Sequence, residues 1–158
     1  MNQLEKQVNA LMRLCTAQDE ADRQKARAEV LELLSGNYSS ADPEYLIHEV
    51  LLDLGAPENL LGHPYMVYAI LLVVEDRTYI DNIMFGLYPQ VAAHFDTTAA
   101  RVERALRHLI EVIFSRTDWK ILQKYFGNTV SPNRGKLTNS EFIARLATIV
   151  KQRMIVAA

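Results

Sequence analysis

Apolar residues recur at helical spacing over residues 98–116, and this periodicity constrains the fold more than any other feature of the chain. One face of that segment is apolar and consists of Val102, Leu106, Leu109 and Ile113, at intervals of four, three and four. Another face is polar and consists of Arg101, Arg104, His108, Glu111 and Ser115. A helix of this kind has to bury its apolar face against other elements. The pattern predicts a long helix packed in the core of a domain.

The rest of the chain also favours helices. The 158 residues contain only six glycines and five prolines, and no long alternating run of β-branched residues is present. Asp42-Pro43 is a helix start, and Thr138 with Glu141 forms a capping-box pattern before another. Besides the long helix, we expect helices over residues 2–34 (one or two), 42–54, 64–75, 89–95, 118–127 and 138–154, and a further segment over 79–85. The fold class predicted is all-α.

Two parts of the chain are separated by turn-forming residues. Residues 1–36 are expected to form an N-terminal helical extension, 37–41 a linker, and 42–158 the main domain. The extension carries a short stripe formed by Leu4, Val8, Leu11 and Cys15. This stripe either joins a second chain or partner or packs on the main domain, and Cys15 is expected to be a buried thiol.

Residues 88–106 have the pattern of a helix-turn-helix. Val91 and Ala92 supply small residues midway along the first helix, and Val102 points back from the second. Asp96 falls at the turn, where aspartate tolerates left-handed backbone, and Thr97 or Thr98 caps the second helix. The residues 98–116 therefore occupy the position of a DNA-reading helix.

The charge of that helix suits DNA, whereas the net charge of the whole chain does not. Residues 101–116 hold four arginines and two glutamates, and guanidinium groups grip guanine or neutralise phosphate. The chain as a whole has a formal net charge of −2, which counts mildly against a nucleic-acid partner. The alternative is a solvated helix face in which Glu103 pairs with Arg107. From periodicity alone the two interpretations are about equally supported.

Several motifs resemble one family closely. They are Leu87-Tyr88-Pro89, Thr97-Thr98, the R-V-E-R-A-x-R-H run of residues 101–108, Ile110-Glu111-Val112, and the T-N-S-E-F-I-A run of residues 138–144. Together they resemble the C-terminal DNA-binding effector domain of the stage-zero sporulation protein A family of response regulators. The similarity extends over about residues 47–150.

The resemblance implies a six-helix bundle that contains the helix-turn-helix and binds double-stranded DNA at TGTCGAA-type boxes, often as tandem copies. It implies that Glu103 and Arg104 read base edges, while Arg101, Arg107 and His108 contact bases or phosphates nearby. Arg134 and Lys136 match basic positions that approach the DNA backbone. The DNA-binding residues predicted are Thr98, Arg101, Glu103, Arg104, Arg107, His108, Arg116, Arg134 and Lys136.

Two departures from the family pattern affect the expected function. Ala93 and His94 stand where the family usually carries lysines, and this loss should weaken attraction to phosphates. The residues before the matched region are also too few for the family's receiver domain, so control by aspartyl phosphorylation within this chain is not expected.

Other functions find little support in the sequence. His48-Glu49 begins like a zinc motif, but Leu52 occupies the second histidine position, and we expect no metal, no cofactor and no enzyme activity. No signal peptide or membrane-spanning segment is evident, so a cytoplasmic, nucleoid-associated protein is expected. Partners expected besides DNA are a second copy, as a homodimer or in tandem, or a protein bound by residues 2–34. The rival function is an antagonist that binds a partner regulator through residues 2–34 and no DNA.

Overall fold

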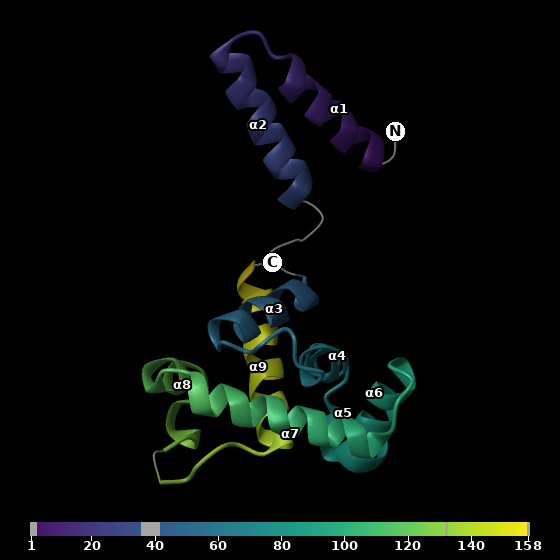
Figure 1. The fold of residues 1–158 in the computed structure, drawn as a ribbon, viewed down its shortest axis with the longest axis vertical. Helices are drawn as coiled ribbons and strands as arrows, with labels where there is room; N and C mark the ends of the chain where they lie inside the picture. Colours follow the sequence, from purple (N-terminus) through teal and green to yellow (C-terminus); the bar gives the residue numbers. More distant parts are fainter. Residues whose placement is uncertain (1–2, 36–41, 132, 158) are drawn as a thin grey trace. The chain divides into compact units, whose positions relative to one another are not determined.

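All regular secondary structure in the part of the chain that the structure describes is helical. The structure is a computed structural model and describes residues 3–35, 42–131 and 133–157, with side chains in the first range described for residues 8–30. The chain divides into two compact units, residues 1–40 and 41–158 (Figure 1). The all-α fold class is confirmed. The predicted linker, residues 37–41, lies outside the described residues.

The first unit is a hairpin of two helices, α1 (Gln3–Thr16) and α2 (Glu20–Ser35). The chain leaves α1 at the polar interval, and the Asp19 carboxylate accepts a hydrogen bond from the Asp22 backbone N–H at 2.7 Å. This bond satisfies a free N–H in the first turn of α2. Of the two arrangements expected for residues 2–34, two helices is the correct one.

Three residues of the predicted stripe on α1, Val8, Leu11 and Cys15, are exposed. Among residues 8–30, the buried side chains are those of Ala10, Ala26 and Val30. Val8 and Leu11 are 46% and 45% exposed, and Cys15 is exposed, so the expectation of a buried thiol was wrong. The physical reason is that α1 packs through its small Ala10, which allows close approach to α2, and this turns the larger apolar residues outward.

The second unit contains the remaining helices. They are α3 (Pro43–Asp53), α4 (Gly62–Glu75), α5 (Thr78–Asp81), the π-helical η1 (Ile83–Leu87), α6 (Tyr88–His94), α7 (Ala99–Arg116), α8 (Trp119–Phe126), the short η2 (Gly127–Thr129) and α9 (Asn139–Ala157). The long helices α4, α7 and α9 contact one another, and α7 crosses α9 (Figure 1). Their shared interior is apolar, with Met66, Leu106 and Phe142 fully buried. A count of six helices stays a prediction, since α5 spans only four residues.

Helix ends in this unit follow local sequence signals. Asp42 caps α3, and Gly55, with φ +67°, follows its end. The capping box before α9 is complete: Glu141 accepts from the Thr138 backbone N–H at 3.0 Å, and Thr138 accepts from the Glu141 N–H at 3.2 Å. The helix starts predicted at Pro43 and Thr138 are confirmed to within one residue.

The segment predicted over residues 79–85 divides into two pieces. Asp76 accepts hydrogen bonds from the backbone N–H and the hydroxyl of Thr78, at 2.9 and 2.7 Å, and so starts α5 early. Asn82 leaves helical geometry, with φ −136° and ψ 58°, and the wider η1 follows.

None of the described helices combines the length and the apolar character that a bilayer crossing requires.

His63 gives this unit a predicted pH dependence. Its side chain is buried, and this burial lowers the pKa of His63 below 6.5, with His48 lowering it further and Glu58 opposing. The unfolded chain then binds a proton more readily than the folded one, so stability is full above about pH 6.5 and declines as the pH falls. We expect urea unfolding to show a lower free energy at about pH 5.5 than at about pH 7.5. In His63→Gln this difference should shrink, and an undiminished difference in that variant would exclude His63 as the cause.

Candidate nucleic-acid interface

The turn between α6 and α7 has the geometry that a helix-turn-helix requires. Asp96 adopts φ +52°, as expected for the turn position. The Thr97 N–H donates to the Ala92 carbonyl at 2.9 Å, which closes the end of α6. The hydroxyl of Thr98 accepts from the Arg101 N–H at 3.3 Å, so of the two threonines considered, Thr98 is the cap.

The apolar face of α7 is fully buried, and this fixes the direction of the opposite face. Val102, Leu106, Leu109 and Ile113 have no exposed surface, and Val91 and Ala92 of α6 are buried as well. The exposed side chains of α7 include those of Arg101, Arg104, Arg107 and His108. The predicted division of α7 into a core face and a solvent face is confirmed.

Several of the cations predicted to meet DNA are paired with carboxylates. Glu103 pairs with Arg107 one turn along α7, as the alternative interpretation of this face required. Glu111 pairs with Lys136 of the loop before α9. That hydrogen bond lowers the pKa of Glu111, which keeps the carboxylate charged.

The arginines at the start of α7 are free of such pairs. Within the described residues, the guanidinium groups of Arg101 and Arg104 form no ion pair and no hydrogen bond. Both are exposed in the first two turns of the helix. The N-terminal turns of a recognition helix are the part that reaches base edges in the major groove. The unpaired donors therefore lie in the first two turns of the second helix of the helix-turn-helix.

The structure brings some predicted residues together and leaves others apart. Lys136 contacts α7 through Glu111, whose other oxygen lies 4.0 Å from His108 Nδ1. Arg107 and Lys136 also line one cavity of about 320 Å³, between α7 and the start of α9.

Arg134 and Arg116 are separate from this cluster. Arg134 pairs with Glu141 at 2.7 Å and donates to the Thr129 carbonyl at 3.2 Å, so its side chain is held against α9 and η2 rather than α7. Arg116 lies fifteen residues after Arg101, which is about 22 Å along the helix axis. Arg116 therefore lies at the opposite end of α7 from Arg101.

His94, at one of the two positions where lysines were expected, forms an aromatic contact. The His94 ring stacks on Tyr68 of α4, with ring centroids 3.9 Å apart, and meets Phe95 edge-on. Ala93 is exposed and has no polar side chain. The end of α6 is thus built for packing against α4.

Asn139 and Gly62 contact α7 in ways that sequence reasoning did not assign. Asn139, at the first residue of α9, is buried and donates to the Tyr88 hydroxyl at 3.0 Å and to the Glu103 carbonyl at 3.1 Å. Gly62 lies against the backbone of α7 at Ala105. A polar residue just inside a capping box, and a glycine that begins a helix, were the only signals, and both have common structural explanations.

The comparison with known families agrees with this geometry. Residues 47–150, more than half of the chain, match the model of the family described as Sporulation initiation factor Spo0A C terminal. That domain is a DNA-binding regulatory domain and its family is not one of enzymes. The match begins in α3 and ends in α9, so it covers the helix-turn-helix and the elements that support it. The chain belongs to the Spo0A C-terminal family and is a DNA-binding regulator of transcription in sporulation.

Proposed function

We propose that the chain reads a TGTCGAA-type box in double-stranded DNA by placing the start of α7 in the major groove. The observation that carries this proposal is the pair of exposed, unpaired arginines, Arg101 and Arg104, on a helix held in place by a fully buried face. Guanidinium groups without a partner in the protein give up no intramolecular hydrogen bond or ion pair when they contact guanine.

The residues of the site divide by chemistry. Arg104 is assigned to a guanine, whose O6 and N7 accept its two parallel N–H groups, and Glu103 to a cytosine N4 donor. Arg107 orients the Glu103 carboxylate through their ion pair. Thr98, Arg101, His108, Arg116, Arg134 and Lys136 are assigned to phosphates or neighbouring bases.

We also propose that aspartyl phosphorylation within these 158 residues does not control binding. Ahead of the matched region, residues 3–35 form the hairpin of α1 and α2. Incubation with a response-regulator kinase should therefore neither label this chain nor change its DNA affinity.

A titration of two duplexes tests the proposed function. One duplex carries the TGTCGAA-type box and the other a scrambled box of the same composition, each at two salt concentrations. Tighter binding to the box, with affinity falling as salt rises, is the expected result. Equal affinities would argue against base reading. Binding to neither duplex would favour the antagonist, a rival supported by the missing lysines at Ala93 and His94 and by the carboxylates on Arg107 and Lys136.

Glu111→Gln is expected to raise DNA affinity for both duplexes. The substitution removes the carboxylate that holds Lys136, so the ammonium becomes available to a phosphate. One additional phosphate contact should steepen the slope of log K against log salt by about 0.9. Adding Lys136→Gln to Glu111→Gln is the matched control, since it removes the released cation and should return the slope to about that of the wild type. Weaker binding by Glu111→Gln would mean that Glu111 positions Lys136 rather than competing for it.

We propose further that the N-terminal hairpin joins two copies of the chain on tandem boxes. Among its residues 8–30, the buried side chains are the small or medium-sized Ala10, Ala26 and Val30, while Val8, Leu11 and Met12 are exposed apolar residues on α1. Two such hairpins packed face to face would form a four-helix bundle and cover that face. Linking two reading heads raises affinity through effective concentration.

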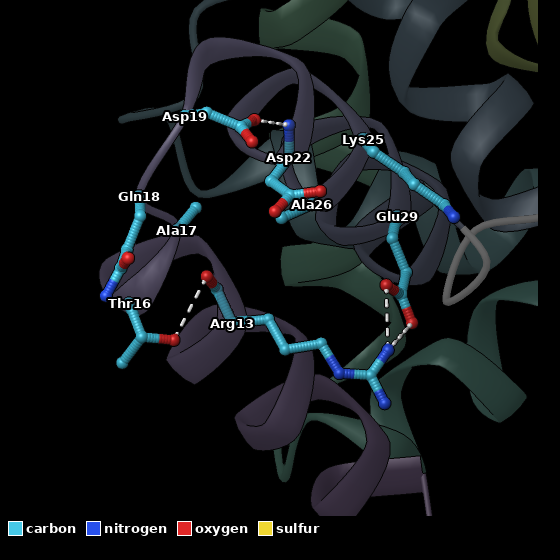
Figure 2. Close-up of a pocket in the computed structure, with 9 residues that line it drawn as sticks. All are labelled: Arg13, Thr16, Ala17, Gln18, Asp19, Asp22, Lys25, Ala26 and Glu29. Carbon is cyan, nitrogen blue, oxygen red and sulfur yellow. Dashed lines mark hydrogen bonds and ion pairs between the residues drawn. The ribbon is translucent and has the colours of Figure 1, made fainter.

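The polar side of the hairpin supports protein association rather than a second DNA contact. Figure 2 shows the cleft of about 530 Å³ between α1 and α2, where Arg13 pairs with Glu29 at 3.2 Å. Asp19, Asp22 and Lys25 also line it, so both signs of charge are present. A phosphate backbone would meet carboxylates as well as cations there.

Leu11→Gln combined with Met12→Gln is expected to abolish the dimer and to weaken binding to a tandem box. The two side chains are exposed in the hairpin, so replacing them should leave its fold intact. Analytical ultracentrifugation and tandem-box titrations measure the two effects, with Gln24→Ala on α2 as a control. A wild-type monomer, or unchanged tandem binding in the double variant, would remove the proposal. If the double variant loses binding to a protein partner but keeps its binding to the tandem box, the exposed face of α1 binds that partner rather than a second copy.

A further inference from the structure

Asn139 is a buried polar side chain that joins three helices at the reading helix. It is 9% exposed, and its Nδ2 donates to the Tyr88 hydroxyl at 3.0 Å and to the Glu103 main-chain carbonyl at 3.1 Å. Tyr88 begins α6, Glu103 lies in the second turn of α7, and Asn139 begins α9. Tyr88 is itself 4% exposed, so both polar groups depend on this contact for their hydrogen bonds.

The contact is directional where the rest of the packing of α7 is not. Apolar contacts decide which face of α7 is buried, but they tolerate small rotations and small shifts along the helix axis, because the hydrophobic effect has no direction. A hydrogen bond loses most of its value when its geometry is lost. Within the described part of the chain, no other buried side chain outside α7 hydrogen-bonds to the α7 main chain. Asn139 is thus the directional anchor of this helix.

The anchor lies at the residue that is assigned to a base. Its partner on α7 is the carbonyl of Glu103, adjacent to Arg104. Base edges are read by hydrogen bonds that tolerate displacements of only about half an ångström. A small rotation of α7 at this turn would misdirect both side chains without removing any phosphate contact.

We propose that Asn139 is a positioning residue for sequence recognition, acting through the main chain of Glu103. The proposal rests on the proposed function, in which Glu103 and Arg104 read bases. It predicts that loss of the amide donor reduces discrimination between sequences more than it reduces attraction to DNA in general.

Asn139→Leu tests the proposal, since it keeps about the size of the side chain and removes the donor without adding a charge. We expect the ratio of affinities, correct box over a box changed at a single base pair, to fall by about fivefold or more. The slope of log K against log salt should stay unchanged, because the number of phosphate contacts does not change. Tyr88→Phe keeps the bond to Glu103 while removing the hydroxyl, and a smaller loss of the ratio is expected from it.

Thr117→Val is the matched control. It removes another inter-helix hydrogen bond, from the Thr117 hydroxyl to the Leu54 carbonyl at 2.6 Å, far along α7 from Glu103. Both variants should lose stability in urea unfolding, but only Asn139→Leu should lose discrimination. If Asn139→Leu does not fold, Asn139→Ala, which removes the same donor with a smaller side chain, gives the same comparison.

The outcomes separate this proposal from the proposed function. A wild-type chain that discriminates, together with an Asn139→Leu or Asn139→Ala variant that retains the full ratio, would overturn the positioning role alone. An equal loss of the ratio in Thr117→Val would overturn it too, because the effect would follow from stability. A wild-type chain that binds both boxes equally would overturn both proposals.

Discussion

Arg104→Ala is expected to weaken binding to the box by about 1–3 kcal/mol, or roughly 5- to 150-fold, and to remove the preference at one base pair. Arg104 is exposed in the first two turns of α7 and forms no ion pair among the described residues. Its loss therefore breaks no internal contact, and the whole effect should appear in binding. Titrations of the box and of variants changed at each position measure it.

Arg104→Lys separates base reading from charge. Lysine keeps the positive charge but lacks the planar pair of donors that fits guanine. We expect this variant to retain the salt dependence of the wild type while losing preference at the same base pair as Arg104→Ala. If Arg104→Ala weakens the box and the scrambled duplex by the same factor, Arg104 contacts a phosphate and the base assignment is wrong.

Of the substitutions that add a single methyl group, Gly62→Ala is expected to lower the free energy of unfolding most. A Cβ atom at Gly62 would lie 2.9 Å from the Ala105 carbonyl carbon, closer still to its oxygen, and 3.0 Å from Leu109 Cβ. The obstructing atoms are mainly backbone and cannot move without shifting α7 against α4. Overpacking of this kind costs about 1–3 kcal/mol, which urea or thermal unfolding measures directly.

Gly86→Ala provides the control for this substitution. A Cβ at Gly86 meets its nearest atoms, on Asn82, at 3.7 Å, which is ordinary contact. Its φ is not in the left-handed region. The unfolding midpoint of Gly86→Ala should therefore lie near that of the wild type. A Gly62→Ala variant as stable as Gly86→Ala would contradict the close approach of α4 to α7.

Local signals account for what the sequence predicted well. The positions of Thr98, Asp96 and the capping box at Thr138 depend on hydrogen bonds within a few residues, and the observed bonds are those expected. The buried stripe of α7 has apolar residues at intervals of three and four, which is the spacing of a helix. Since the apolar residues lie on one face, the sequence also predicted which face is buried. These signals also placed the helix-turn-helix, because α6 and α7 are neighbours in the chain.

Contacts between distant residues account for what was missed. Glu111 and Lys136, or Asn139 and Glu103, are neighbours only after α9 has packed beside α7. Cys15 was wrongly expected to be buried, because the face of α1 that is covered depends on how the two helices pack, and that face contains Ala10. The division of residues 78–87 into α5 and η1 depends on Asn82, whose own conformation no propensity rule specified.

Backbone amide shifts of the full chain, recorded by NMR as the box duplex is added, test most directly whether α7 is the reading helix. The account predicts that the largest changes fall on residues 98–108, with smaller ones at Lys136, and that the scrambled duplex produces weaker changes in the same region. Changes confined to residues 8–30 of the hairpin, or to α8 and the end of α9, would contradict it.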